Sequence, residues 1–127
     1  MRAVKKLRRN TAVALDFYKK KSAMSGNVMV VDLTGFRFAE LGHYAPYYLH
    51  PKLRYAVRYY LSSRHRSLFH INVSANPWRR SENDKHIGKL LKKYGGGGHK
   101  NVGGVEIKGR GKTLAVVRDF VTFLNKK

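Results

Sequence analysis

The sequence predicts a single α/β domain, with α+β as the alternative, built on a mixed β-sheet. Three observations support this prediction. The 127 residues fit one domain and are enough to bury a core without disulfides. Hydrophobic residues make up 43% of the chain, unlike the composition of a disordered basic tail. Segments of helical and strand periodicity also alternate along the chain, with no linker or repeat between them.

The N-terminal segment is predicted to be a basic helix. Apolar residues over 3–23 recur at helical spacing, with lysines and arginines on the other face. The sequence SGN at 25–27 is expected to end this helix. We therefore divide the chain into a basic N-terminal helix, 1–25, and a folded domain, 26–127.

Strand patterns follow. The apolar run VMVVDL at 28–33 predicts a buried strand, while 34–52 mixes glycine, proline and aromatic residues without a clear period. Residues 54–61 alternate as in a half-buried strand, and 68–75 alternate again after a polar turn. These two segments predict a central β-hairpin.

The C-terminal part predicts a helix, a strand and a second helix. Residues 84–94 have an apolar face, Asn83 or Asp84 can cap the start, and Gly95 suits a left-handed position after the end. GVEIK at 104–108 predicts a strand, and 113–127 predicts a closing helix. We expect these helices to pack on the sheet.

Charge is the most unusual property of the sequence. Twenty-seven lysines and arginines face seven acids, a net charge of +20, and each third of the chain is basic. Such a domain repels itself unless a polyanion is near, so nucleic acid is the expected partner. A basic surface that serves solubility alone is the weaker reading, and an anionic membrane is weaker still.

Several other classes are excluded or disfavoured. The absence of cysteine rules out disulfides and cysteine-ligated zinc, and no apolar run approaches a membrane span. The seven acids are scattered singly, and GRGKT at 109–113 lacks the leading glycine of a phosphate-binding P-loop. We expect no metal site and no hydrolytic centre within the chain. We expect an intracellular, cytoplasmic protein, with an organellar location as the alternative because the start is rich in arginine and lysine.

Four consecutive glycines, Gly95, Gly96, Gly97 and Gly98, stand before His99 and Lys100. They suit either a flexible linker or a loop whose backbone closely approaches an anion, and their ordered flanks favour the loop. A helix C-terminus precedes the loop and repels anions, so Lys100 and His99 would have to supply the attraction.

The stretch YGGGGHKNVGGVEI resembles the signature of the DHH-associated domain, the C-terminal subdomain of DHH-family phosphoesterases. Gly95–Gly98 and His99 match its GGGH run, and Gly103 and Gly104 match its small–Gly end, while Val102 is bulkier than usual. INVSANPWRR at 71–80 also resembles the strand and loop of one branch of that family. The similarity covers 28–127.

The resemblance implies substrate binding. In the family this subdomain holds the nucleotide or nucleic-acid end of the substrate against a two-manganese centre, which a separate Asp-His-His subdomain provides. This sequence has no Asp-His-His motif, so we expect no catalysis by the chain itself and no cofactor, with manganese only if a catalytic half completes it. The resemblance places a phosphate or terminal nucleotide at the glycine loop and His99, beside Lys100, with Arg79 as a looser candidate.

The expected nucleic-acid surface is broader than this loop. Trp78 suits base stacking, although a lone tryptophan more often fills a core. The remaining residues of the predicted surface are the cations Lys5, Lys6, Arg8, Arg9, Lys19, Lys20, Lys92 and Lys93.

The predicted function is therefore a non-catalytic nucleic-acid-binding module, with RNA as the expected ligand and other proteins of a ribonucleoprotein as further partners. The alternative is the substrate-binding half of a manganese-dependent DHH-family phosphoesterase or exonuclease that acts on nucleotides or short oligonucleotides.

Overall fold

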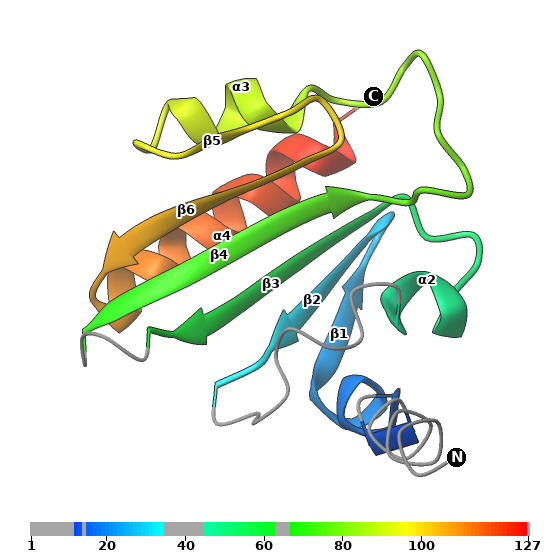
Figure 1. The fold of residues 1–127 in the computed structure, drawn as a ribbon, viewed down its shortest axis with the longest axis horizontal. Coiled ribbons are helices and arrows are strands. Elements are labelled where there is room, and N and C mark those ends of the chain that lie inside the picture. The colour runs from blue at the N-terminus through cyan, green and yellow to red at the C-terminus, as the bar shows by residue number, and fades with distance from the viewer. Residues whose placement is uncertain (1–11, 14, 35–44, 63–66, 127) are drawn as a thin grey trace, which may run out of the picture.

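The structure is a computed structural model that describes residues 12–13, 15–34, 45–62 and 67–126. Six strands form one sheet in the order β1-β2-β3-β4-β6-β5 (Figure 1). The strands are β1 Ser22–Ser25, β2 Val28–Asp32, β3 Tyr55–Leu61, β4 Leu68–Ala75, β5 Gly97–Gly98 and β6 Val102–Lys108. The helices are α2 Ala45–Leu49, α3 Ile87–Lys92 and α4 Arg110–Asn125, and residues 12–13 and 15–21 are also helical.

The sheet is mixed, as predicted. Strands β2 and β3 are parallel, with α2 in the connection between them, and every other neighbouring pair is antiparallel. Helix α4 crosses one face of the sheet, where it contacts β2, β3, β4 and β6 (Figure 1). The predicted α/β class is confirmed.

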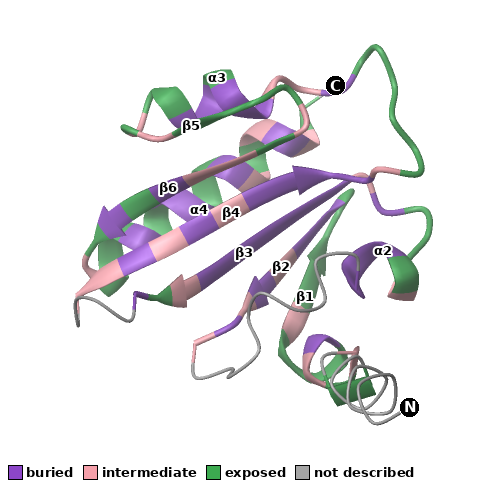
Figure 2. Ribbon diagram, viewed as in Figure 1, coloured by how far each residue is buried: buried purple, intermediate pink, exposed green. Residues whose placement is uncertain are grey.

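The central hairpin is confirmed as well, but β3 is not half-buried. Its register with β4 runs from Tyr55 opposite Ala75 to Leu61 opposite Phe69. Five successive residues of β3, 55–59, are buried, because helices lie on both faces of the sheet at this strand (Figure 2). Arg58, which alternation would place towards solvent, is only 4% exposed.

Two hydrophobic clusters lie on opposite faces of the sheet. The larger joins alternate residues of β3, β4 and β6 to α3 and α4, and the smaller joins β2 and β3 to α2 and the N-terminal helical residues. The larger cluster centres on Val57, Ile71, Val73, Leu91 and Phe120, and the smaller on Tyr18, Met29, Val31, Leu33 and Tyr47. Helix α4 covers one face of β4 and β6. Successive side chains of a strand point to opposite faces, so every second residue of these two strands lies on the face away from α4.

The N-terminal helix ends earlier than predicted. Its last helical residue is Lys21, and the next four residues form β1, which pairs with β2 through a turn at Gly26, where φ is +60°. The Asn125 side chain at the end of α4 accepts a hydrogen bond from the Asn27 amide and donates one to the Ser25 carbonyl, each at 2.9 Å. This tertiary clamp on the turn has no local sequence signal. The first part of the predicted helix lies outside the described residues.

The two C-terminal helices are confirmed with different ends. Helix α3 is capped by His86, whose Nδ1 accepts from the Lys89 amide at 3.1 Å, so the expected cap at Asn83 or Asp84 is wrong. Asp84 is instead engaged by Arg54. Gly95 has φ +88° just beyond the helix, as predicted. Helix α4 begins at Arg110, three residues before its expected start.

Candidate nucleic-acid-binding site

The glycine stretch, Gly95–Gly98, is one arm of a short hairpin. Gly97 and Gly98 form β5 and pair with Gly104 and Gly103 of β6. The turn is closed by the His99 amide, which donates to the Val102 carbonyl at 2.8 Å. The stretch is therefore part of the sheet edge, which argues against the linker reading.

Close packing of the backbone explains two of these four glycines, Gly96 and Gly98. A methyl group on Gly96 would lie 2.5 Å from the Gly104 carbonyl oxygen, and one on Gly98 would meet the Gly103 backbone. A methyl on Gly88 in α3 would lie 2.5 Å from the Gly98 carbonyl oxygen. The close approach that sequence analysis assigned to an anion thus also serves the packing of α3 against β5 and β6.

Several backbone N–H groups around the stretch already donate within the chain. The Gly95 and Gly96 amides donate to carbonyls of α3, and the first amides of α3, Ile87 and Gly88, donate to the Lys100 and His99 carbonyls. These groups are used in holding the hairpin to the helix. The side chains of His99 and Lys100 are exposed beside these amides, and the binding of an anion there stays a prediction.

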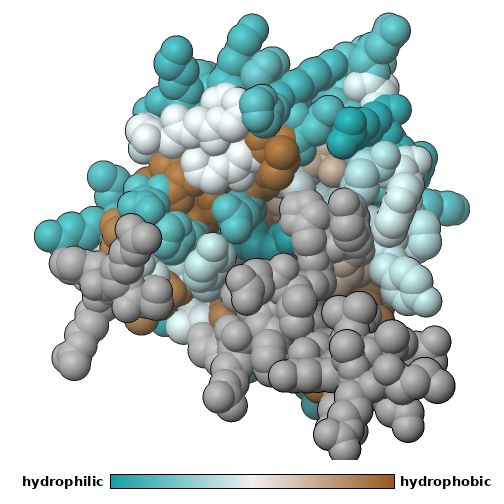
Figure 3. Space-filling model, viewed as in Figure 1, coloured by the Kyte–Doolittle hydropathy of each residue, from teal (hydrophilic) through white to brown (hydrophobic). Residues whose placement is uncertain are grey.

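A hollow of about 460 Å³ borders the glycine stretch on the sheet face opposite α4. Its lining is mainly polar: His70, Asn72, Gly95, Gly96, Gly104, Val105 and Glu106. Within it, His70 Nδ1 lies 3.6 Å from a Glu106 carboxylate oxygen, and the His70 ring stacks on Tyr60 with ring centres 5.2 Å apart. Figure 3 shows this face, with hydrophilic side chains along its upper edge.

The loop that carries Trp78 and Arg79 leaves the sheet beside the turn of the glycine hairpin. The Ala75 amide, at the end of β4, donates to the Asn101 carbonyl at 2.8 Å, which joins the loop base to the turn after His99. Trp78 is 61% exposed, so the reading of this residue as a core side chain is wrong. Arg79 is also exposed, and its Nη1 donates to the Lys52 carbonyl at 3.1 Å.

The other predicted cations are distributed over the molecule. Lys92 and Lys93 are exposed at the end of α3, where the Lys93 ammonium lies 5.7 Å from the centre of the Phe123 ring. Lys19 and Lys20 are exposed on the N-terminal helical residues, far from α3 (Figure 1). Lys20 pairs with Asp16 at 3.1 Å. Lys5, Lys6, Arg8 and Arg9 lie outside the described residues.

Sequence reasoning missed a buried polar group at the centre of the sheet. Arg58 Nη2 donates to the Ser74 hydroxyl at 2.8 Å, and the Tyr47 hydroxyl donates to the Ser74 carbonyl at 2.9 Å. Burial raises the pKa of the Tyr47 phenol, against the lowering effects of its hydrogen bond with Ser74 and of the Arg58 charge. No local sequence signal marks this arrangement, because the alternation of the strand places Arg58 towards solvent.

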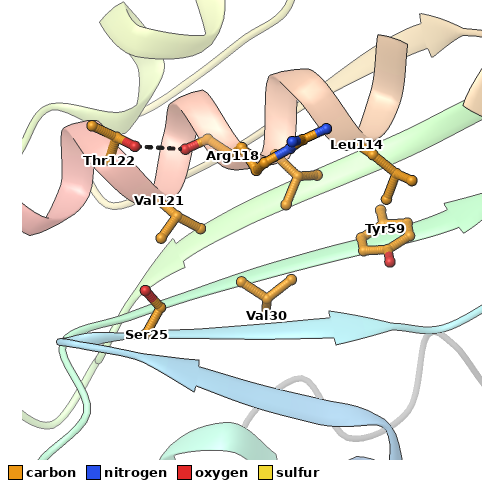
Figure 4. A pocket seen from close by; sticks show the side chains of 8 residues that line it. Ser25, Val30, Tyr59, Leu114, Arg118, Val121 and Thr122 are labelled. Atoms are coloured by element: carbon orange, nitrogen blue, oxygen red, sulfur yellow. Dashed lines mark hydrogen bonds between the residues drawn. The ribbon is translucent and has the colours of Figure 1, made fainter. Parts of the chain in front are cut away.

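A second hollow, of about 570 Å³, lies between α4 and the β1–β3 part of the sheet. Figure 4 shows Val30, Leu114 and Val121 around it, with Arg118 near its rim. The Thr122 hydroxyl, which also lines it, donates to the Arg118 carbonyl at 3.0 Å. The walls are mainly apolar and include none of the predicted site residues.

Among the residues that the structure describes, no three His, Cys, Asp or Glu side chains gather as a group able to hold a metal ion. In the same part of the chain, no helix is both long and apolar enough to span a membrane.

No protein-family model matches the sequence, and no curated protein does. Solved structures do match the fold. A pGpG-specific phosphodiesterase, PggH from Vibrio cholerae, has a TM-score of 0.82 and 21% identity over 93% of this chain. An exopolyphosphatase-related protein from Bacteroides fragilis has a TM-score of 0.67 and 12% identity over 91% of it. The C-Ala domain of Aquifex aeolicus alanyl-tRNA synthetase has a TM-score of 0.58 and 12% identity over 84% of it.

These likenesses establish the fold. The chain has the fold of a DHH-associated domain, as its glycine-rich signature indicated. It spans 40% of the phosphodiesterase and 35% of the exopolyphosphatase-related protein, but 99% of the C-Ala domain.

Proposed function

We propose that this domain binds RNA as a module that does no chemistry itself, through a basic surface that includes the glycine hairpin. The observation that carries the proposal is the charge imbalance. Seven acids can neutralise at most seven of the 27 lysines and arginines one-to-one, so twenty cations have no counter-charge in the chain. Phosphates supply that counter-charge, and their binding releases condensed ions.

Ion pairs within the described residues already use three of the seven acids. Asp16 pairs with Lys20, Asp84 with Arg54, and Asp32 lies 3.9 Å from Arg110. The carboxylates are thus partly occupied by intramolecular ion pairs, while cations of α3 and of the loop after β4 are exposed. This distribution supports an extended interface with a polyanion.

The structural neighbours support the choice of ligand class. One is a domain of an enzyme that acts on a transfer RNA, and another acts on pGpG, a dinucleotide. Both ligands contain phosphodiesters and nucleobases. We extend the proposal to a place in a ribonucleoprotein, beside other proteins.

The second candidate is the substrate-binding half of a manganese-dependent phosphoesterase, and the TM-score of 0.82 to the phosphodiesterase favours it. In this candidate the polar hollow beside Gly95 and Gly96 holds the substrate's nucleotide. Manganese and hydrolysis would come from another part of the protein or from a partner.

Filter binding with single-stranded RNA of increasing length separates the two candidates. An RNA-binding surface predicts affinity that rises from dinucleotide to 20-mer, with the RNA recovered intact. Binding that is already maximal at a dinucleotide would instead support the phosphoesterase half. Equal, weak binding at every length would overturn both.

A further inference from the structure

The loop over 76–86, between β4 and α3, carries the only tryptophan of the chain on its outer surface. Trp78 is 61% exposed, and its neighbours Arg79 and Arg80 are exposed as well. A side chain of this size exposed to that extent offers much of its flat face to a partner.

The loop is held firmly at its start. Asn76 is 1% exposed, and its side-chain amide donates to the Pro51 and Leu53 carbonyls at 3.1 and 2.7 Å. Its side-chain oxygen accepts from the Trp78 amide at 2.9 Å. A single buried side chain thus fixes the backbone that presents the indole.

The rest of the loop is held at two more points. Arg79 donates to the Lys52 carbonyl, and the buried Asp84 carboxylate accepts from Arg54 at 2.6 Å and from the Ser81 amide at 2.8 Å. An exposed aromatic ring on an ordered loop binds a flat partner without a further ordering cost, which favours affinity.

Cationic residues flank Trp78 in the loop. Lys52, Arg79 and Arg80 are exposed near Trp78, and Glu82 is the exposed acid of the loop. We call Lys52, Trp78, Arg79 and Arg80 the Trp78 surface. It adjoins the turn that carries His99 and Lys100, because the loop and that turn are joined by the hydrogen bond between Ala75 and Asn101.

We infer that the Trp78 surface is a stacking site for one base of a single-stranded nucleic acid, with its cations on the flanking phosphates. This inference rests on the proposed function and adds a recognition mode to it. Aromatic rings among cations bind single strands because every unpaired base offers a flat face, whereas a duplex stacks its bases internally.

The single tryptophan makes the site directly observable. Because Trp78 is the only indole, the protein's tryptophan emission reports this surface alone. Titration with oligouridylate is expected to change the emission and to saturate with the binding curve measured by filter assay. Inorganic polyphosphate, which has the charge without bases, is expected to bind without that change. RNA binding that leaves the emission unaltered would overturn the inference while the proposed function stands.

Substitutions provide an independent test. Trp78→Ala is expected to weaken single-stranded RNA binding about 5- to 150-fold, the range for one stacked base, without altering the salt dependence. Trp78→Phe is expected to restore most of the affinity. Arg79→Ala with Arg80→Ala is expected to reduce the slope of log K against log salt by about 0.7 for each phosphate that the variant no longer neutralises.

The controls distinguish a failure of the stacking site from a failure of the proposed RNA-binding function. Arg118→Ala removes an exposed cation on α4, and it is expected to weaken binding less than either loop variant does. Circular dichroism checks that each variant folds. Unchanged affinity in Trp78→Ala would overturn the stacking site alone, whereas failure of the unsubstituted protein to bind RNA would overturn the proposed function.

Discussion

The Arg54 guanidinium donates from Nη2 to a carboxylate oxygen of Asp84 across 2.6 Å. This hydrogen bond joins the start of β3 to the end of the loop over 76–86. The Asp84 side chain is 3% exposed and the Arg54 side chain 35%. This hydrogen bond raises the pKa of the Arg54 guanidinium. The other Asp84 oxygen accepts from the Ser81 amide, so this one carboxylate holds both ends of the segment 81–84.

Removal of this acid should destabilise the fold. Asp84→Ala leaves Arg54 and the Ser81 amide without their acceptor, so we expect the free energy of unfolding to fall by about 1–3 kcal/mol. Urea denaturation measures this change. Glu82→Ala, an exposed acid in the same loop, is the control and should change stability by less than about 0.5 kcal/mol. Equal effects of the two substitutions would show that the Arg54–Asp84 pair does not hold the loop.

Alanine at Gly88 should be destabilising although it lies within a helix. Replacing a helical glycine by alanine ordinarily gains about 0.5–1 kcal/mol. Here the added methyl would lie 2.5 Å from the Gly98 carbonyl oxygen, so we expect a decrease of about 1–3 kcal/mol in thermal or urea unfolding. Gly111→Ala in α4, where nothing lies within 4 Å, should be neutral or stabilising. A stabilised Gly88→Ala protein would contradict the close packing of α3 on β5.

Alkaline pH should destabilise the protein through its buried phenols. Burial raises the pKa of Tyr47, and also that of Tyr18, so the folded state keeps these protons when the unfolded state loses them near pH 10. The unfolded state then binds fewer protons, and stability falls as pH rises above about 10. Below that pH the folded and the unfolded states both hold the phenol protons, so the contribution of these phenols to stability is fully present.

The variant Tyr47→Phe isolates one of these phenols. At neutral pH it should be less stable by about 1 kcal/mol, because the hydrogen bond to Ser74 is removed. Between pH 10 and 11 its unfolding free energy should decline less steeply than that of the unsubstituted protein, as measured by urea titrations at a series of pH values. Parallel curves over that range would rule out Tyr47 as a source of the alkaline destabilisation.

The turn after the glycine stretch should bind phosphate groups of the RNA. His99→Ala with Lys100→Ala removes the two exposed side chains there, so we expect weaker RNA binding and a salt slope lower by about 0.7, since one lysine no longer neutralises a phosphate. Lys112→Ala at the start of α4 removes the same charge away from the turn and should have a smaller effect. If the two proteins bind alike, the turn has no special part in RNA binding. If nucleotide binding is abolished while RNA binding persists, the polyanion is held elsewhere on the surface.

Local pattern was sufficient for most of the fold. The apolar run of β2 reflects burial on both faces of the sheet, whereas the alternation in β4 and the helical period of α4 reflect burial on one face. These elements therefore follow from their own residues. The resemblance of the glycine-rich signature pointed to the correct fold because three of its glycines, Gly96, Gly98 and Gly103, are closely packed where α3, β5 and β6 meet. The role of these glycines in packing could not be predicted from the sequence, because it depends on the atoms that they approach in the fold.

The errors share one physical cause, which is contact between residues far apart in the chain. Arg54 and Asp84 are thirty residues apart, and the Asn125 clamp on the β1–β2 turn spans 98 residues to Asn27. Strand β5 has two glycines and no periodicity to read. The exposure of Trp78 depends on a buried asparagine that holds the loop, and composition alone favoured the core.

The salt dependence of single-stranded RNA binding tests the central claim most directly. If the basic surface of this domain binds the phosphate backbone, log K should fall linearly with log salt, with a slope of about −0.7 for each phosphate neutralised and several phosphates in total. Measurements with a 20-mer between roughly 50 and 400 mM salt are expected to give such a slope. A slope near zero over that range would contradict the account.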